Sequence, residues 1–348
     1  MTHELRNIVQ AFQAAEKKQL KTVLATVVAL EGSSYRRPGV RMLLREDGKM
    51  VGAVSGGCVE KEVFRQSQSV FSDDTPKMMT YDGRYRLGCE GILYILIEPF
   101  EPRQEFLTAF ESVLAERKSF EVVSHFSKQG GADIAFGSLF RLGGKEVPVR
   151  PTFQTDNKST SKEIKGTAME TEIFEQEMPP RFKLVIIGAE HDAVQLCLFA
   201  SLTGWEVSII AAASEEKEIH HFPGAEHFTA VEPDMLSTSD IDHRTALMVM
   251  THSYVRDLQY LLAIKDVRPA YLGLLGPSHR RERLLGDFIE RYPQVSDDFI
   301  DAIHGPAGLN IGAETAQEIA LAIMAEILSV IRNQKPMMLK NKSGRIHS

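Results

Sequence analysis

Hydrophobic residues in the first 148 positions follow two spacings, one typical of helices and the other typical of strands. Apolar residues recur every three or four positions in some segments, and β-branched or apolar runs fill others. The predicted helices are 4–18, 58–70 and 105–117, and the predicted strands are 22–30, 42–44, 50–54, 92–97 and two more within 120–142. Residues 1–148 therefore predict one α+β domain.

From residue 182 onward, uninterrupted apolar runs alternate with helical periodicity. The predicted strands are 182–188, 205–210, 245–251 and 270–276, and the predicted helices are 192–204, 256–266, one from Ser278, and 314–333. Strands that are apolar on both faces and alternate with helices are typical of a parallel, doubly wound sheet. We therefore expect a Rossmann-like domain over residues 181–335, followed by a polar tail at 336–348.

The sequence predicts how the last helix begins and where a linker separates the two domains. Thr315 and Glu318 have the spacing of a capping box, and the helix they begin is apolar almost all round, so we expect it to be buried. Residues 149–180 are polar, rich in Thr, Lys and Glu, and have prolines near both ends, which predicts a linker. We expect partial order in this linker, with Ile173 and Phe174 as the residues that could dock on a neighbour.

Composition narrows the class of protein. The chain has 348 residues, 43% of them hydrophobic, and a net charge of −7, so we expect neither nucleic acid nor a membrane as a partner. No signal peptide or membrane span is predicted. Three widely spaced cysteines make no disulfide framework and favour a reducing, cytoplasmic location. Of these, Cys197 lies in an apolar helix and is expected in the core.

The turn after the first strand of the second domain resembles an incomplete dinucleotide fingerprint. In "VIIGAEHDAVQL", Gly188 suits the tight turn and Ala193 replaces the third glycine, but Glu190 stands where a pyrophosphate needs bare backbone. The second strand also ends without an acid for a ribose hydroxyl before Glu215 and Glu216. The fold is predicted, whereas NAD is disfavoured as a ligand.

A second candidate anion site follows the strand that ends near residue 276. In "GLLGPSHRRERL", Gly276 precedes a helix start that carries Ser278, His279, Arg280 and Arg281. Free N–H groups and guanidiniums at a helix start suit a phosphate, although a solvated basic helix face is an equal alternative. Replacing Arg280 or Arg281 should then weaken ligand binding and leave folding almost unaffected.

Two further loops of the second domain are candidates, one after a predicted strand and the other immediately before the predicted buried helix. "MTHSY" places Thr251 and His252 at a carboxyl strand end, where open α/β sheets bind ligands, although a lone histidine there is often structural. "HGPAGLNIGAET" offers further candidate ligand-binding residues, namely His304, Gly305, Gly308 and Asn310. Its glycines suggest close approach of a ligand to the backbone, with a tight structural loop as the alternative.

The first domain places a cysteine at a glycine corner, in "GAVSGGCVEKEV". Cys58 follows Gly56 and Gly57 at a predicted helix start, where the helix dipole favours a thiolate. Cys89, in "LGCEG", has a similar open setting. A small buried residue at a tight corner is the alternative, and the nearby carboxylates Glu60 and Glu62 work against strong activation.

Together these segments resemble the XdhC/CoxI family of xanthine dehydrogenase accessory factors. The resemblance rests on "EGSSYRRPGVRMLLREDGKMVGAVSGGCVEKEV" and "YRLGCEG" in the first domain. In the second it rests on "THSYVRDL", "YLGLLGPSHRRERL" and "IHGPAGLNIGAETAQEIALAIMAEI", in the same order. The chain differs from the usual family pattern at Glu190, at Asn310 and in "GCEG", where the family usually has GCGG.

The resemblance implies a maturation factor for molybdenum hydroxylases. Such a protein binds the molybdenum cofactor, a molybdopterin with a dithiolene and a phosphate, and hands it to an apo xanthine dehydrogenase or related enzyme. It further implies that Cys58, with Cys89 assisting, is a molybdenum ligand or a station for the terminal sulfur, with a cysteine desulfurase as a possible partner. A homodimer is expected.

Two other functions remain open from the residues alone. An NAD(P)- or flavin-dependent oxidoreductase would use the same sheet, but Glu190 and the missing acid disfavour it. A scaffold that binds only proteins would leave the clustered glycines and the basic helix start unexplained.

Overall fold

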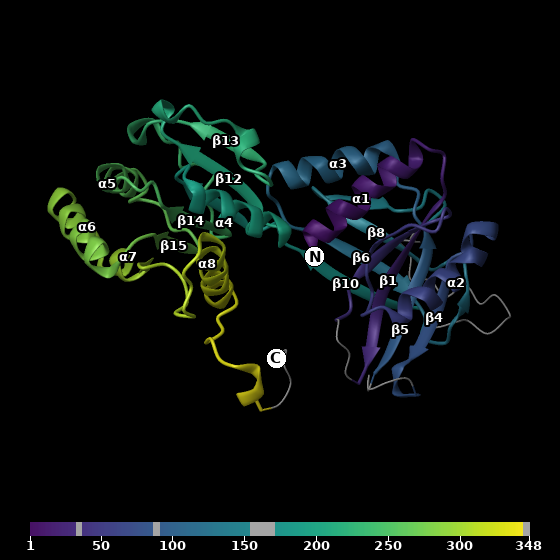
Figure 1. The fold of residues 1–348 in the computed structure, drawn as a ribbon. Helices are drawn as coiled ribbons and strands as arrows, with labels where there is room; N and C mark the ends of the chain where they lie inside the picture. The colour runs from purple at the N-terminus through teal and green to yellow at the C-terminus, as the bar shows by residue number, and fades with distance from the viewer. Residues whose placement is uncertain (33–36, 86–90, 154–170, 344–348) are drawn as a thin grey trace. The chain divides into compact units, whose positions relative to one another are not determined.

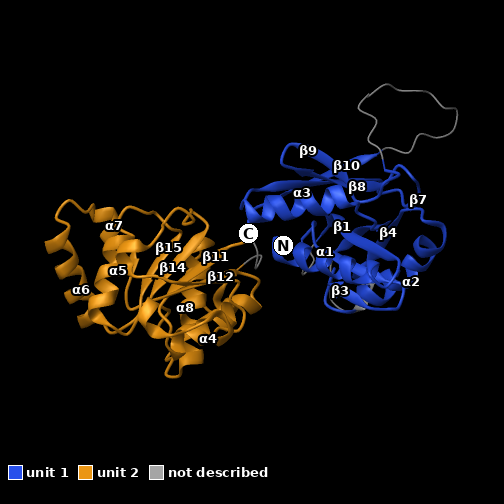
Figure 2. Cartoon of the chain, turned by 90° about the horizontal axis from the view of Figure 1, so that it is seen from above, with its two compact units in different colours: residues 1–180 blue, residues 181–348 orange. Residues whose placement is uncertain are grey.

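The computed structural model describes residues 1–32, 37–85, 91–153 and 171–343, and the chain forms two compact units. Unit 1 is residues 1–180 and unit 2 is residues 181–348, as coloured in Figure 2. Unit 1 mixes helices with antiparallel sheets, and unit 2 is an α/β unit with one parallel sheet (Figure 1). Among the described residues, no helix is long and apolar enough to cross a membrane.

Unit 1 contains two antiparallel sheets. The first is made of β1 (Thr22–Glu31), β2 (Arg41–Arg45), β3 (Met50–Gly52), β4 (Lys77–Asp82), β5 (Ile92–Pro99) and β7 (Gly131–Ala132), and the second of β6 (Phe120–Phe126), β8 (Gly137–Leu142), β9 (Lys145–Pro148) and β10 (Glu172–Met178). The first sheet has the order β3-β2-β1-β5-β4-β7, and the second has the order β10-β6-β8-β9. All described pairs in both sheets are antiparallel.

Alternation along β1 divides the interior of unit 1 into separate cores. Val23 and Ala25 face α2 (Cys58–Asp73), which packs its own valines on that side of the first sheet. Leu24 faces the opposite core, which also contains the apolar sides of α1 (Thr2–Glu16) and α3 (Gln104–Ala115). This period of two is what a strand buried on both faces requires. It places α2, and the glycine corner before it, on one side of the sheet.

The end of the predicted linker is part of unit 1. Residues 172–178 form β10, which pairs with β6 along its whole length, and Gln176 accepts a hydrogen bond from Arg41 at 2.6 Å. Phe174 packs against a core of unit 1, as expected for a docked segment, whereas Ile173 is exposed. Along the sequence, the boundary between the two compact units therefore lies between Pro180 and Arg181.

Unit 2 has one sheet in which every described strand pair is parallel. Its strands are β11 (Lys183–Ile187), β12 (Glu206–Ala211), β13 (His227–Ala230), β14 (Thr245–Val249), β15 (Tyr271–Leu274) and β16 (Ile303–His304), and its helices are α4 (His191–Leu202), α5 (Tyr254–Ala263), α6 (Ser278–Arg291), α7 (Asp297–Asp301) and α8 (Ala316–Ile331). The order β13-β12-β11-β14-β15-β16 confirms the predicted Rossmann-like, doubly wound sheet.

Helices cover both faces of the sheet in unit 2. Residues of α4 and α8 share one core with alternate strand residues, and residues of α5, α6 and α7 share the other. The Thr315–Glu318 capping box is confirmed, because each residue bonds the other's backbone N–H. The expectation that the last helix is buried all round is wrong on one side, where Leu321 is 51% exposed and Leu328 is 38% exposed.

Candidate functional site

The carboxyl edge of the sheet in unit 2 brings the predicted pocket residues together. Gly188 follows β11, Thr251 follows β14, Gly276 follows β15, and His304 ends β16, and these four strands are neighbours in the sheet. The strand order reverses direction between β11 and β14, which is where open α/β sheets bind ligands. The residues predicted to line a pocket thus lie along one edge of the sheet, and their binding of a ligand stays a prediction.

Gly188 is required by the packing of two strand ends. Its φ is +143°, and a Cβ there would lie 2.4 Å from the carbonyl oxygen of Met250. No L-residue fits without moving β11 from β14. Glu190 follows at the N-cap position of α4, exposed and without a side-chain cap, so its carboxylate stands where the fingerprint needs bare backbone.

The other predicted glycines of unit 2 also lie against protein atoms. A Cβ on Gly276 would lie 2.8 Å from Cδ of Arg280, and one on Gly305 would lie 2.8 Å from Cδ of Arg281. Gly308 approaches the backbone of Ala322 on α8, with a Cβ distance of 3.3 Å. These glycines make room for the chain's own arginine stems and for α8, which is the structural alternative that the sequence left open.

A buried carboxylate, Asp257, fixes the loop after β14 and the start of α6. Its Oδ1 accepts hydrogen bonds from the backbone N–H and the hydroxyl of Thr251, at 3.1 and 2.6 Å. Its Oδ2 pairs with a guanidinium nitrogen of Arg280 at 2.5 Å. Arg280 is thus a structural partner, and the expectation that its replacement leaves folding almost unaffected does not fit this contact.

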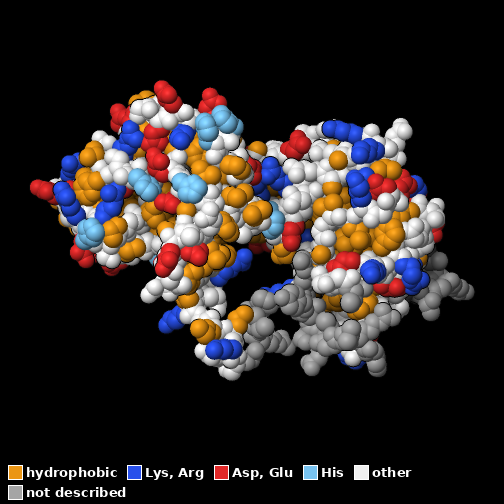
Figure 3. All heavy atoms as spheres, viewed as in Figure 1, with side chains coloured by type: hydrophobic (Ala, Val, Ile, Leu, Met, Phe, Trp, Pro, Cys, Tyr) orange, Lys and Arg blue, Asp and Glu red, His pale blue; other side chains and the backbone are white. Residues whose placement is uncertain are grey.

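Arg281 lies on the other side of the predicted phosphate site. One of its guanidinium nitrogens is 3.5 Å from the carbonyl oxygen of Ile303, and its Nε is buried without a hydrogen-bond partner among the described residues. Ser278 is exposed at the start of α6. Lysine and arginine side chains gather over this helix in Figure 3. Arg281 and Ser278 therefore remain the candidates for an anion at this helix.

Glu326 on α8 joins β15, the end of β16 and the glycine loop. Its Oε2 accepts hydrogen bonds from the hydroxyl of Tyr271, at 2.5 Å, and from the backbone N–H of Gly308, at 2.7 Å. Its Oε1 lies 3.2 Å from Nδ1 of His304, whose ring stacks on Tyr271 at 4.5 Å between centroids. Partial burial alone would raise the pKa of Glu326, but the hydrogen bonds from His304, Tyr271 and Gly308 lower it to about 2.

His252 connects the elements on either side of the point at which the strand order reverses. Its Nε2 lies 3.2 Å from Oδ2 of Asp192 in the first turn of α4, and its backbone has a φ of +57°. The contact links the loop after β14 to the helix after β11. Asn310, further along the glycine loop, is exposed.

The first acid after β12 is paired within the protein. Glu215, the first acid after that strand, pairs with Arg256 at 2.5 Å, and Arg256 also donates a hydrogen bond to Ser214. Burial raises the pKa of Glu215, and Arg256 opposes that shift. The carboxylate is already used within the protein.

The glycine corner of unit 1 differs from Gly188, Gly276, Gly305 and Gly308 of unit 2, because the described part of the chain leaves space around it. No described atom lies within 4 Å of a Cβ built on Gly56 or Gly57, and Gly57 has a φ of +126°. Cys58 begins α2 as predicted. The side chain of Cys58 and all of Cys89 lie outside the described residues.

Glu60 holds this corner from within α2. Its carboxylate accepts hydrogen bonds from the backbone N–H of Ser55 at 2.7 Å, the Ser55 hydroxyl at 3.0 Å and the Gly57 N–H at 2.8 Å. Burial would raise the pKa of Glu60, but these hydrogen bonds outweigh it and lower the pKa. Glu62 is bonded by Arg65 and Gln66. Glu60 therefore stays ionised at the corner itself, and the expectation that it works against a thiolate at Cys58 stays a prediction.

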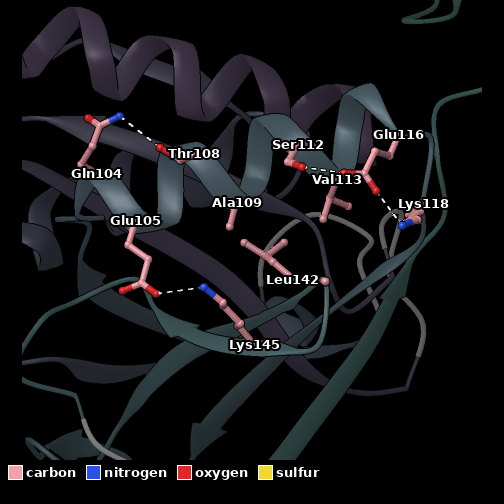
Figure 4. A pocket seen from close by; sticks show the side chains of 11 residues that line it. Gln104, Glu105, Thr108, Ala109, Ser112, Val113, Glu116, Lys118, Leu142 and Lys145 are labelled. Atoms are coloured by element: carbon pink, nitrogen blue, oxygen red, sulfur yellow. Dashed lines mark hydrogen bonds and ion pairs between the residues drawn. The ribbon is translucent and has the colours of Figure 1, made fainter.

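Cys197 and a groove of unit 1 carry no part of the candidate site. Cys197 is fully buried in the core under α4, and burial raises the pKa of its thiol to about 12. A groove of about 550 Å³ lies between α3 and the turn after β8 (Figure 4). Its charged side chains pair with one another, Lys145 with Glu105 and Lys118 with Glu116. Within the described part of the chain, no cluster of side chains could hold a metal ion directly.

Sequence reasoning missed the two carboxylates that organise the edge of unit 2. Asp257 follows the strand end by several residues and lies within "THSYVRDL", but sequence reasoning assigned it no role. Glu326 had a signal, because it is the lone acid in the apolar stretch "IALAIMAEILSVI". A single charge in a buried helix usually has a partner.

Comparison with known proteins extends over both units. The description "XdhC Rossmann domain" matches residues 184–327, and "XdhC and CoxI family" matches residues 15–82. A Bacillus subtilis protein named as a probable xanthine dehydrogenase subunit is 30% identical over 319 residues, which cover 89% of this chain and 93% of that protein. The "Molybdenum cofactor insertion chaperone PaoD" of Escherichia coli is 24% identical and covers 96% of this chain and 91% of its own length.

A solved structure gives the same result for the fold. The crystal structure of a xanthine dehydrogenase from Bacillus halodurans superposes with a TM-score of 0.76 at 27% identity, covering 94% of this chain and 96% of that one. Likeness in sequence and in fold thus extends over nearly the whole chain. The chain belongs to the XdhC and CoxI family.

Proposed function

We propose that this protein is an accessory chaperone that binds the molybdenum cofactor and delivers it to a xanthine dehydrogenase-type enzyme. The observation that carries the proposal is the match over 96% of the chain to a relative named as a molybdenum cofactor insertion chaperone. The relative named as part of a xanthine dehydrogenase supports the class of client enzyme. The cofactor is cargo in this proposal, and catalytic turnover is not required.

The residues at the carboxyl edge of unit 2 suit part of such a cargo. His304 is partly exposed, and its Nε2 has no hydrogen bond to a described residue, so it can bond a polar atom of a ligand. Ser278 and Arg281 offer donors for a phosphate at the start of α6. Arg280 contributes less than its position suggested, because Asp257 holds one side of its guanidinium.

The glycine corner of unit 1 is the proposed site of sulfur chemistry. The open space at Gly56 and Gly57 would admit a ligand or a partner's sulfur next to Cys58. We propose Cys58, assisted by Cys89, as a ligand to the cargo's molybdenum or as a station for its terminal sulfur, with a cysteine desulfurase as the donor. Cys58→Ala and Cys58→Ser should lower xanthine dehydrogenase activity in a strain that depends on this protein. Full activity with both variants would show that the corner is structural.

NAD is not part of the proposed function. Glu190 places an exposed carboxylate where a pyrophosphate would approach, and Glu215 is already paired with Arg256. Calorimetric titration should show no binding of NAD or NADP at micromolar concentration. Binding in that range would favour the oxidoreductase alternative.

Cargo binding can be tested directly. The protein is purified from cells that make the molybdenum cofactor and from matched cells that do not, and bound pterin is released, oxidised and measured by fluorescence. We expect pterin only in the first preparation. Equal, background fluorescence in both preparations would refute cargo binding.

We also propose that the protein acts as a homodimer. On α8, Leu321 and Leu328 leave apolar surface that a second copy would cover. Light scattering on purified protein should give twice the chain mass. A monomer at micromolar concentration would refute this part of the proposal.

A further inference from the structure

Glu326 has one acceptor oxygen facing two donors and the other facing a histidine. Tyr271 and Gly308 both donate to Oε2, at 2.5 and 2.7 Å, whereas Oε1 faces only Nδ1 of His304 at 3.2 Å. Neither the sequence motifs nor the relatives assign a role to Glu326. Its three partners come from β15, the end of β16 and the glycine loop.

The ionisation of Glu326 decides which nitrogen of His304 carries the proton. With its pKa lowered to about 2, the carboxyl is ionised at neutral pH and can only accept hydrogen bonds. When the His304 ring is neutral, its single proton must then lie on Nδ1. The stacked ring of Tyr271 fixes the plane of the imidazole.

We propose that Glu326 is a positioning residue of the proposed ligand site, which holds the neutral His304 ring in the tautomer that presents an unprotonated Nε2 to the ligand. Nε2 makes no hydrogen bond to the described residues, and the side chain is 30% exposed. An unprotonated Nε2 accepts a hydrogen bond, so it selects a ligand group that donates one. The N–H groups of a flat heterocycle such as a pterin have this chemistry, and this identification rests on the proposed function.

The same carboxylate also fixes the backbone next to the histidine. The Gly308 N–H bond to Oε2 ties the glycine loop to α8, and the absence of a side chain lets Gly308 lie against Ala322. Glu326 therefore sets both the direction of the His304 ring and the course of the loop that follows it. A purely structural hydrogen bond would fix the same histidine tautomer but would leave ligand binding unchanged when the tautomer changes, so the proposal is tested by measuring the tautomer and the bound ligand together.

The variant Glu326→Gln makes the tautomer prediction sharp. The glutamine has one oxygen, and placing it toward Tyr271 and Gly308 keeps two hydrogen bonds. Its NH₂ group then faces Nδ1 of His304 and donates to it, which forces the proton to Nε2. The variant should therefore convert His304 from an acceptor at Nε2 to a donor at the same atom, with little change of shape.

The experiment uses the full chain with ¹⁵N-labelled histidine, in which two-bond ¹H–¹⁵N spectra distinguish the tautomers. The chain has 11 histidines, and the signals of His304 are identified by their loss in His304→Gln. We expect the Nδ1–H tautomer in the wild type and the Nε2–H tautomer in Glu326→Gln. Glu290→Gln, an exposed position on α6, serves as the control and should leave the spectrum of His304 unchanged.

Pterin content after expression in cofactor-producing cells is the second measurement. Glu326→Gln should reduce it about tenfold, the usual effect of turning one acceptor into an opposing donor, and Glu290→Gln should not. The same tautomer in wild type and Glu326→Gln would overturn the positioning role. A changed tautomer with undiminished pterin would overturn the ligand contact. Absence of pterin from the wild type would refute the proposed function instead, and the tautomer measurement would still decide the role of Glu326.

Discussion

Replacing Arg280 with alanine is expected to destabilise unit 2 as well as to alter ligand binding. The guanidinium pairs with Asp257 at 2.5 Å, and the side chain of Asp257 is only 4% exposed. The alanine variant leaves this carboxylate without its cation, although Thr251 still donates two hydrogen bonds to it. The cost of that loss can be worked out from the burial of the two groups.

Breaking a fully buried ion pair typically costs roughly 3–5 kcal/mol, and losing one charge-assisted hydrogen bond costs roughly 1.5–3 kcal/mol. Arg280 is 24% exposed, so water can reach the carboxylate once the guanidinium is removed. We therefore expect the free energy of unfolding of unit 2 to fall by about 2–3 kcal/mol. A double-mutant cycle with Asp257→Asn should show a coupling of at least about 1 kcal/mol, because the two groups touch.

Trp205 provides the assay. It is the single tryptophan of the chain, lies buried in unit 2, and packs against Phe182 at 4.8 Å between ring centroids. Its fluorescence in urea therefore reports the unfolding of unit 2. The matched control is Arg283→Ala, on the same helix, where the guanidinium lies over the ring of Tyr254 at 4.9 Å and the expected loss is below about 1 kcal/mol. Equal stability of the two variants would refute the structural role of Arg280.

Two further predictions concern the fold of each unit. Gly188→Ala should destabilise unit 2 by about 3 kcal/mol, because its Cβ would meet the Met250 carbonyl at a φ of +143°. Gly286→Ala, with open space around it on α6, should instead raise stability by up to about 1 kcal/mol in the same urea titration. Burial raises the pKa of Glu98 to about 7, so the folded state holds a proton that the unfolded chain releases. Stability of unit 1 should therefore fall as pH rises from about 4.5 to 7, and Glu98→Gln should abolish that slope in unfolding followed by circular dichroism; an unchanged slope would contradict this assignment.

The sequence predicted the parallel sheet of unit 2 well because its strands are buried on both faces. Runs such as "KLVII" in β11 and "TALMV" in β14 have no competing helical spacing. β10 was placed in a linker because its sequence, "EIFEQEM", is largely polar. It is an edge strand with several exposed side chains. Its pairing with β6 holds it in the sheet, although its composition does not indicate a strand.

The candidate site was predictable in position but not in its contacts. Predicted strand ends locate the carboxyl edge, so Gly188, Thr251 and Gly276 could be placed there from periodicity alone, whereas the two-residue strand that ends at His304 was not predicted. Which glycines approach a ligand could not be predicted, because a glycine that accommodates an arginine stem has the same sequence signature. Asp257 and Glu326 act through residues distant in sequence, and only the fold brings those partners together.

The central claim is that this protein delivers the molybdenum cofactor to a client enzyme. The most direct measurement is the activity gained by an apo xanthine dehydrogenase when it is mixed with cofactor-loaded protein. Free cofactor at the same concentration and the unloaded protein are the comparisons. We predict that the loaded protein restores more activity, and faster, than free cofactor does, while the unloaded protein restores none. Equal activation by free and protein-bound cofactor, or no activation by the loaded protein, would contradict the account.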